Sequence, residues 1–325
     1  MSLTEIYRSG KTPKALYFAG AWLKSNRPGA LARHELQRIL RTWQDRQDAE
    51  AIAARLDFYF PLPADGKLLM PEEGSVSLHH PVIEGAHSVY LYDLRSWRKY
   101  FPAGMRLHFK AGDVFENPQV PTIIKARRLD CPGSENAIIF PLNTLRHFPH
   151  PHDAIPFSKK EPTLFFRGKI ALKPGRIELV KRYYGHPGMD MADTGHSPEL
   201  RQYQRPKVSI AAHFRYKYIL VPEGNDVGSA LGWVLGSNCV PVISKPQVEH
   251  WLMHSRLEAG RHYIEVSPDF SDLEEKLEWA ESHPALCGEI SEEGRRYYSQ
   301  FLDSGREKII ALLILHRYFE ATGQI

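Results

Sequence analysis

The sequence of 325 residues lacks the short motifs that identify several classes of α/β enzyme. It contains no G-x-x-x-x-G-K-[ST] and no G-x-G-x-x-G, so neither a P-loop nor a dinucleotide fingerprint can be claimed. The absence of G-x-S-x-G weighs against an α/β-hydrolase. There is no D-x-D pair, although an enzyme that holds a sugar nucleotide through a metal ion normally needs two closely spaced carboxylates. If a diphosphate is bound, fixed protein groups must therefore supply the positive charge.

Cysteine and long apolar runs are also scarce. Cys131, Cys239 and Cys287 are too few and too scattered for a disulfide framework or a zinc knuckle, which predicts reduced, buried thiols in a cytoplasmic protein. Residues 1–23 carry polar and charged side chains throughout, so they predict neither a signal peptide nor a membrane span. The nearest candidate for a span, residues 309–315, is short and flanked by charges, and it predicts an amphipathic helix.

Positive charge is present but not concentrated in any block. The net charge is +4 and the pI is about 8.8, which favours anionic ligands. Nucleic-acid binding would require Lys and Arg clustered with aromatic residues on one surface, so we expect no nucleic-acid partner. Three histidines lie within residues 145–153, but Pro149 and Pro151 exclude the helical His-x-x-x-His geometry of many zinc sites. We therefore expect no metal there.

The first half of the chain has the alternation of predicted helices and strands that is typical of an α/β domain. Apolar residues at helical spacing from Pro28 to Leu56 predict a long helix or a helix pair, and the aromatic residues 57–62 predict a strand. Short apolar runs from Ser88 onward, separated by turn residues and a short helix at 97–100, predict a mainly parallel sheet. These strands are expected over 88–93, 107–110, 121–127 and 136–142.

One carboxylate in this half stands where a reaction could use it. Asp113 follows the strand 107–110 behind Ala111 and Gly112, and would project at the carboxyl edge of the sheet. The alternative is an aspartate that caps a turn or a helix.

The second half of the chain also alternates predicted strands and helices. It follows a proline-rich segment that predicts a linker. A strand at 163–166 runs into Arg167 and Gly168, and a helix from about 175 to 184 carries Arg176 on its first turn. The remaining predicted elements are a strand at 188–191, an interrupted helix at 198–212, a strand at 262–266, a helix opening at 270–271 and a closing helix at 303–319. The predicted domains are 1–157 and 158–302, followed by a C-terminal helix over 303–325 for which packing against the first domain is one arrangement.

The segment 213–251 is the strongest candidate for a binding site. It predicts a strand at 216–221, a turn at Pro222 to Asn225, an N-cap at Asp226, a helix from Val227 to Leu235 and a second strand at 239–243. A helix N-terminus at the carboxyl end of a buried strand suits a phosphate group. The groups that could neutralise a phosphate are Arg167, Arg176, Arg215, Lys217 and the N–H groups of residues 227–229.

Several of these segments together resemble the family 90 glycosyltransferases. The resemblance rests on FFRG at 165–168, YKYILVPEGNDVGSALGWVLGSNCVPV at 216–242, the segment around Trp251, HYIEV at 262–266 and SDLEEKLEW at 271–279. YLYDLR, GDVFENPQVPTIIKAR and RHF extend it upstream, so that it covers residues 88–305. Within the family the sequence is most similar to the bacterial lipopolysaccharide A protein branch.

The resemblance implies a GT-B fold, in which two Rossmann-like domains with mainly parallel sheets face one another. It implies an inverting, metal-independent transfer from a UDP-sugar, bound mainly by the C-terminal domain, with an N-terminal aspartate as general base. Asp113 is the nearest counterpart of that aspartate, and Asp93 is the second candidate. The arginine of the family's FRG motif corresponds to Arg167, and a second arginine to Arg176.

The sequence departs from the related eukaryotic enzymes at one turn. Where those enzymes carry Arg-Gly, this chain has EGND at 223–226, so the diphosphate would depend on Arg167, Arg176 or Lys217. Glu223 could instead hold ribose hydroxyls. The full donor-binding set that the resemblance implies is Arg167, Gly168, Arg176, Lys217, Glu223, Gly224, Asn225, Asp226, Gly228 and Ser229.

The expected function is transfer of a sugar from a UDP-sugar to a glycan or lipid-linked glycan acceptor, in lipopolysaccharide or surface polysaccharide synthesis. No cofactor and no metal are expected beside the donor substrate. The expected location is the cytoplasm, and the basic balance is compatible with peripheral contact at the inner membrane. A non-catalytic protein of the same fold that binds nucleotide sugars or glycans is the alternative. Nothing in the sequence indicates an oligomeric state.

Overall fold

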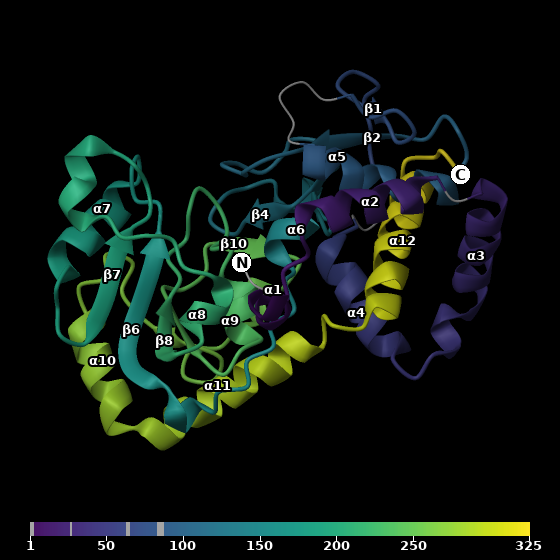
Figure 1. The fold of residues 1–325 in the computed structure, drawn as a ribbon. Helices are drawn as coiled ribbons and strands as arrows, with labels where there is room; N and C mark the ends of the chain where they lie inside the picture. The colour runs from purple at the N-terminus through teal and green to yellow at the C-terminus, as the bar shows by residue number, and fades with distance from the viewer. Residues whose placement is uncertain (1–2, 27, 63–65, 83–87) are drawn as a thin grey trace. The chain divides into compact units, whose positions relative to one another are not determined.

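The protein folds into two compact α/β units, each assembled from segments that are distant in sequence (Figure 1). The computed structural model describes residues 3–26, 28–62, 66–82 and 88–325. Unit 1 comprises residues 1–12, 147–246 and 255–300. Unit 2 comprises residues 13–146, 247–254 and 301–325.

Unit 1 is built on a five-stranded parallel sheet in the order β11-β9-β8-β6-β7. Its strands are apolar along most of their length because helices cover both faces of a parallel sheet. The strands are β6 (Glu161–Gly168), β7 (Met189–Asp193), β8 (Tyr216–Leu220), β9 (Val240–Ile243) and β11 (Ile264–Glu265). Leu164, Phe166, Tyr218, Leu220 and Val242 are all at most 5% exposed and form the centre of this core.

The helices of unit 1 follow its strands in the alternation that the sequence predicts. They are α1 (Leu3–Ser9), α7 (Pro174–Tyr183), α8 (Ile210–His213), α9 (Leu231–Leu235), α10 (Leu273–Ser282) and α11 (Pro284–Ser299), with 3-10 turns at Phe157–Lys159 and Pro198–Tyr203. Helix α11 was missed by the sequence analysis. It contacts both α9 and β9 and buries Cys287, Ile290 and Tyr298 against the sheet.

Unit 2 contains a four-stranded sheet in the order β1-β2-β3-β5, in which only β1 runs antiparallel to its neighbour. A separate antiparallel pair joins β4 to β10. The strands are β1 (Val76–Ser77), β2 (Arg106–Lys110), β3 (Thr122–Ile124), β4 (Ala126–Arg128), β5 (Ala137–Ile139) and β10 (Val248–His250). The helices are α2 (Lys14–Ser25), α3 (Gly29–Thr42), α4 (Ala49–Tyr59), α5 (Ser88–Arg95) and α12 (Ser304–Ala321), with 3-10 turns at Trp43–Asp45, Arg98–Tyr100 and Ser134–Asn136. Two short elements lie at unit boundaries, α6 (Thr144–His147) and a 3-10 turn at His254–Arg256.

Helix α12 anchors the core of unit 2. The Asp303 side chain accepts hydrogen bonds from the N–H groups of Gly305 and Arg306 at 2.9 and 3.0 Å, which confirms the predicted helix start. Residues 309–315 are all buried, so this run is a core helix. In the described part of the chain no helix is long and apolar enough to cross a membrane.

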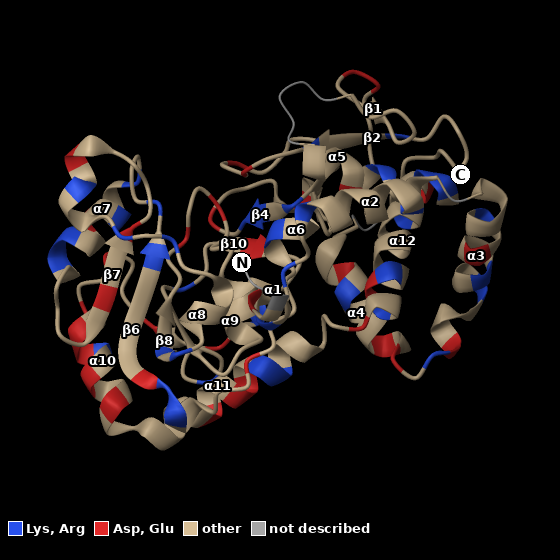
Figure 2. Ribbon diagram, in the orientation of Figure 1, with Lys and Arg blue, Asp and Glu red and all other residues tan. Residues whose placement is uncertain are grey.

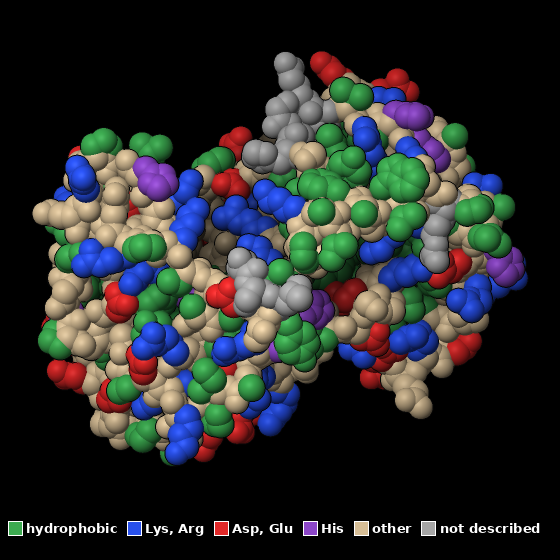
Figure 3. Space-filling view, in the orientation of Figure 1, with side chains coloured by type: hydrophobic (Ala, Val, Ile, Leu, Met, Phe, Trp, Pro, Cys, Tyr) green, Lys and Arg blue, Asp and Glu red, His purple; other side chains and the backbone are tan. Residues whose placement is uncertain are grey.

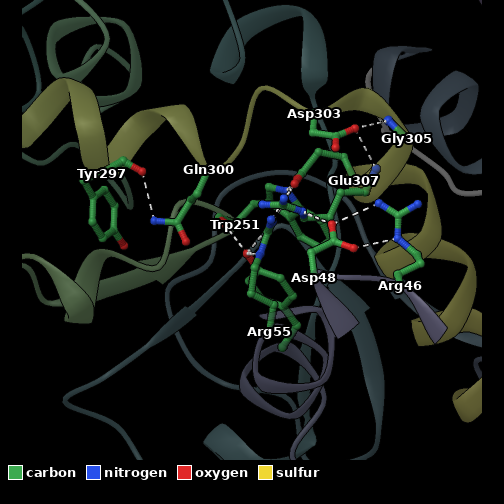
Figure 4. A network of polar contacts seen from close by, with 11 residues as sticks. Arg46, Asp48, Arg55, Trp251, Tyr297, Gln300, Asp303, Gly305 and Glu307 are labelled. Atoms are coloured by element: carbon green, nitrogen blue, oxygen red, sulfur yellow. Dashed lines mark hydrogen bonds and ion pairs between the residues drawn. The ribbon is translucent and has the colours of Figure 1, made fainter. Parts of the chain in front are cut away.

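A partly buried ion pair ties three segments of unit 2 together (Figure 4). Arg55 of α4 donates to both carboxylate oxygens of Glu307 in α12, at 2.5 and 2.8 Å. The indole N–H of Trp251 donates to the same carboxylate at 2.5 Å. The Tyr59 hydroxyl donates to the carbonyl oxygen of Trp251 at 2.6 Å, and the two rings stack with centroids 4.1 Å apart. The short segment 247–254 is therefore fixed to α4 and α12.

Two strands predicted from the sequence are helical in the structure. Residues 88–93 lie in α5, where Tyr90, Asp93 and Leu94 are buried at the i, i+3, i+4 spacing of a helix. Residues 57–59 end α4, whose Tyr59 is fully buried. In both places the aromatic residues favour a strand locally, but packing of a helical face decides the structure. The helix pair after Pro28, now seen as α3 and α4, and the mainly parallel sheets are confirmed.

Candidate active site

The carboxyl ends of the strands of unit 1 meet at one edge of the sheet, where ligands bind in open α/β folds. Strand β6 ends at Gly168, which pairs with Asp193 at the end of β7. Strand β8 ends at Leu220, which pairs with Val242 of β9. The loops leaving these strands include Lys169 to Lys173 and the turn at residues 221–230. The predicted donor-binding residues Gly168, Glu223, Gly224, Asn225, Asp226, Gly228 and Ser229 all lie at this edge.

The turn after β8 differs from the prediction in one respect. Helix α9 begins at Leu231 with Ala230 as its N-cap, so Asp226 is not the N-cap and residues 227–229 are not helical. The Gly224 N–H donates to the carbonyl oxygen of Asp226 at 2.9 Å and closes a tight turn before the helix. Because α9 has only five residues, its dipole is a weak source of positive potential.

Glycine is required by space at one position of this turn. A Cβ added to Gly228 would lie 2.8 Å from Cγ1 of Val221 and 3.4 Å from the carbonyl oxygen of Pro222. The backbone of residue 228 thus packs directly on the end of β8.

Arg176 brings a positive charge to the turn that lacks an arginine of its own. It lies in the first turn of α7, and its Nη2 donates to the carbonyl oxygens of Pro222 and Glu223, both at 2.8 Å. The same nitrogen would be 3.4 Å from a Cβ placed on Gly224. Lys173 adds a second cation, donating from Nζ to Oδ1 of Asn225 at 2.5 Å. Figure 2 shows basic residues at the end of β6 and in the segment that leads to α7.

Arg167 is held by the neighbouring strand. Its Nη2 donates to both carboxylate oxygens of Asp190 in β7 at 2.7 and 2.8 Å, and its Nη1 donates to two backbone carbonyls. The side chain is 9% exposed and its guanidinium lies over the Phe165 ring, 4.5 Å from the centroid. Arg167 Nε has no hydrogen-bond partner among the described residues. The partner Asp190 was not predicted from the sequence.

Asp193 is a buried carboxylate that the sequence analysis missed. It is fully buried at the end of β7, and its Oδ1 accepts from the N–H groups of Ile170 and Gly195 at 3.1 and 2.9 Å. Its Oδ2 finds no partner in the described part of the chain. Asp193 thereby fixes the start of the loop that carries Lys173. The signal was available, because Asp193 follows an apolar strand in the way that Asp113 does.

Two predicted phosphate ligands lie elsewhere. Lys217 is the second residue of β8, at the amino end of the strand, and pairs with Glu281 of α10 at 3.5 Å. Pro222 lies five positions further along the extended chain, a span of about 16 Å. Arg215 precedes the same strand and pairs with Glu161 at 2.6 Å. The structure therefore separates Lys217 and Arg215 from the other predicted donor-binding residues.

Of the two candidate bases in unit 2, Asp113 is the accessible one. It follows β2 after Gly112, whose φ of 100° lies in the region that favours glycine. The Asp113 side chain is 36% exposed, and its Oδ1 accepts from Nζ of Lys125 at 3.1 Å. The Lys125 side chain is only 1% exposed, so a fixed cation stands beside a carboxylate that solvent and substrates can reach.

Asp93 is enclosed by donors. It accepts hydrogen bonds from the Tyr17 hydroxyl at 2.5 Å, the Thr144 hydroxyl at 2.8 Å and the Thr144 N–H at 3.0 Å. Burial raises the pKa of Asp93 to about 6, although these hydrogen bonds act in the opposite direction. This environment suits a structural carboxylate that joins α2, α5 and the Thr144 backbone.

No cluster of three or more His, Cys, Asp or Glu side chains in the described ranges could hold a metal ion. The three cysteines form no disulfide; Cys239 and Cys287 are buried and Cys131 is partly exposed. Burial raises the pKa of Cys239 to about 11, which makes this thiol a poor nucleophile.

Comparison with known proteins identifies the family of the chain. The family model described as glycosyl transferase family 90 matches residues 142–318, which include every strand of the unit 1 sheet. O-glucosyltransferase LpsA of Dichelobacter nodosus is 32% identical over 302 residues, covering 92% of this chain and 90% of that protein. The chain belongs to glycosyl transferase family 90. The resemblance to the family 90 glycosyltransferases drawn from the sequence is thereby confirmed.

The eukaryotic relatives of this family 90 member match a smaller part of it. Protein O-glucosyltransferase 2 of Danio rerio is 29% identical over 152 residues, covering 45% of this chain and 30% of that protein. Protein O-glucosyltransferase 3 of Homo sapiens is 26% identical over 167 residues, covering 50% of this chain and 32% of that protein. The family 90 protein is thus a glycosyltransferase, an enzyme that moves a sugar from a donor to a glycan acceptor.

Proposed function

We propose that this glycosyltransferase moves glucose from UDP-glucose to a glycan or lipid-linked glycan acceptor, with inversion at the anomeric carbon and without a metal ion. The observation that carries the proposal is Arg176, whose guanidinium reaches the 222–224 turn at the carboxyl edge of a parallel sheet. The choice of glucose is supported by the names of three relatives, each an O-glucosyltransferase. In this proposal the two units form a GT-B enzyme.

On the donor side, Arg176 and Lys173 stabilise the diphosphate. The charge on the β-phosphate grows as the glycosidic bond breaks, and preorganised cations lower the energy of that transition state. Asp193 holds the backbone that places Lys173, and Arg167, fixed by Asp190, contributes positive potential at the end of β6. Glu223 accepts hydrogen bonds from the ribose hydroxyls.

On the acceptor side, Asp113 acts as the general base. Its carboxylate takes the proton from an acceptor hydroxyl while that oxygen attacks the anomeric carbon, and UDP leaves from the opposite face. Lys125 keeps the carboxylate oriented. One displacement by one nucleophile gives inversion.

We place the acceptor in lipopolysaccharide or surface polysaccharide synthesis and the enzyme in the cytoplasm, in peripheral contact with the inner membrane. The experiment that tests the reaction is a thermal-shift panel of UDP-glucose, UDP-galactose and UDP-xylose in EDTA, followed by UDP release with candidate acceptors. UDP-glucose should raise the unfolding temperature most, because a ligand that binds only the folded state stabilises it. A larger shift with another sugar would change the donor, and activity that needs added manganese would overturn metal independence.

A further inference from the structure

Helix α2 (Lys14–Ser25) of unit 2 is apolar on two opposite faces. One face packs inside the unit: Tyr17 hydrogen-bonds to Asp93, Phe18 contacts the Tyr92 ring with centroids 5.2 Å apart, and Ala21 is buried. A helix on the surface of a globular unit normally carries polar residues on its other face. This helix does not.

The outward face of α2 forms what we call the α2 stripe. It consists of Leu16, Ala19, Trp22 and Leu23, which recur at the i, i+3, i+6, i+7 spacing of one helix face. Leu16 is 65% exposed, Trp22 60% and Leu23 63%. Figure 3 shows hydrophobic side chains gathered over the position of α2. Three large apolar side chains along a single helix mark an interaction site rather than scattered surface residues.

The charges around the α2 stripe select its partner. Helix α2 contains no Asp or Glu, and the exposed residues Lys14 and Lys24 stand at its two ends. The helix has 12 residues and is therefore about 18 Å long. A second copy docked about a two-fold axis would place the lysines of one helix beside those of the other, which is unfavourable. An anionic surface with an apolar interior complements both the stripe and the lysines.

We propose that the α2 stripe binds the surface of a bilayer containing anionic phospholipids. Leu16, Trp22 and Leu23 enter the boundary between headgroups and acyl chains, where amphipathic helices lie and where tryptophan is favoured. Lys14 and Lys24 contact lipid phosphates. This proposal gives the peripheral membrane contact of the proposed function a defined surface and a defined lipid charge.

The test is co-sedimentation of the full chain with vesicles of phosphatidylcholine mixed with phosphatidylglycerol, and with vesicles of phosphatidylcholine alone. The wild type should bind the anionic vesicles. The triple variant Leu16→Gln/Trp22→Gln/Leu23→Gln should lower the partition coefficient at least tenfold, and glutamine keeps the helix propensity of α2. The matched control is Leu286→Gln on α11, which removes a leucine that is 45% exposed outside the stripe and should bind as the wild type does.

A second variant tests the charges without touching the apolar residues. Lys14→Ala/Lys24→Ala should weaken binding to anionic vesicles about 25-fold, about fivefold for each lysine, and 0.5 M salt should act in the same direction. Circular dichroism and the thermal midpoint establish that each variant is folded.

Three results would overturn the proposal. They are a wild type that stays in the supernatant with anionic vesicles, a folded triple variant that binds like the wild type, and a wild-type dimer in sedimentation velocity that the triple variant converts to monomer. The last result would assign the α2 stripe to a second copy of the chain. UDP release is measured on the same samples, so that failure of the membrane contact and failure of the proposed reaction are distinguished.

Discussion

At the scale of single residues, the affinity of the candidate site for an anion depends on which protein groups hold its arginines. Arg176 is fixed by two backbone carbonyls of the turn, whereas Arg167 is fixed by the carboxylate of Asp190. A guanidinium paired with a carboxylate has much of its charge neutralised, which applies to Arg167 beside Asp190. Because Arg176 reaches the 222–224 turn, it should matter more than Arg167 for the affinity of the diphosphate, although the FRG motif drew attention to Arg167 first.

The role of Arg176 can be measured directly. Arg176→Ala should raise the Kd for UDP about tenfold to a hundredfold, because a hydrogen bond to a charged group contributes about 1.5–3 kcal/mol. Isothermal titration calorimetry gives the affinity. Lys217→Ala is the matched control, since it removes a cation from the opposite end of β8 and should leave the Kd unchanged. An equal loss of UDP affinity in Arg176→Ala and Lys217→Ala would contradict the role of Arg176 in binding the diphosphate.

If Asp113 is the general base, its substitution should change the turnover number and leave the affinity for UDP unchanged. Asp113→Asn keeps the shape of the side chain but removes the base, so kcat should fall about 100-fold to 10,000-fold while the Kd for UDP stays the same. UDP release with the true acceptor and calorimetry with UDP give the two quantities. Turnover close to that of the wild type would remove Asp113 from the role of base.

At the scale of elements, helices α2 and α5 are joined through one carboxyl group. Asp93 of α5 accepts from Tyr17 of α2, and burial raises its pKa to about 6 from an ordinary value of 3.8. A raised pKa means that the folded state prefers the protonated form. The contribution of Asp93 to stability is complete below about pH 4 and is lost as the pH rises through 6.

This linkage predicts a pH-dependent stability. The free energy of unfolding of the wild type, measured relative to Asp93→Asn, should fall by about 2 kcal/mol between pH 4 and pH 7, since each unit of pKa shift corresponds to about 1.4 kcal/mol. Urea unfolding at a series of pH values provides the measurement. Tyr17→Phe removes a hydrogen bond that lowers the pKa, so it should move the window to higher pH. If the free energy of unfolding changed with pH in the same way for the wild type and for Asp93→Asn, the raised pKa of Asp93 would be refuted.

At the scale of the whole molecule, both units depend on segments brought together from distant parts of the chain. Strand β10 pairs with β4 although more than a hundred residues separate them, and the segment that follows β10 carries Trp251 to the Arg55–Glu307 pair. The network in Figure 4 thus secures a segment that leaves unit 1 and returns to it. Its loss should cost more than the loss of an exposed ion pair.

The expected cost can be stated for one substitution. Glu307→Ala leaves the Arg55 side chain, which is 5% exposed, without its carboxylate and should lower the free energy of unfolding by about 3 kcal/mol. Glu161→Ala is the control, because it breaks the exposed pair with Arg215 and should cost at most about 1 kcal/mol. Urea unfolding compares the two, and a cost for Glu307→Ala no larger than for Glu161→Ala would contradict the role of the network.

The elements that were predictable are those whose sequence pattern is strong by itself. Local propensity and spacing predict four such elements: the apolar run of β8, the run into Arg167 in β6, the first turn of α7 and the Asp303 cap of α12. Residues 88–93 were mistaken for a strand because tyrosine favours strands locally, while the contact of α5 with α2 favours a helix. The late start of α9 and the close packing of Gly228 against Val221 are features that no local pattern shows.

The sequence by itself determined the family and the α/β class and located a candidate donor-binding turn, because these depend on motifs and on short-range periodicity. Only the tertiary structure decided which charges serve that turn. It placed Arg176 on the turn, paired Arg167 with Asp190, paired Lys217 with Glu281 and enclosed Asp93 among three donors. The reason is physical: a side chain's charge acts over a few ångströms, and separation along the chain does not reveal separation in space.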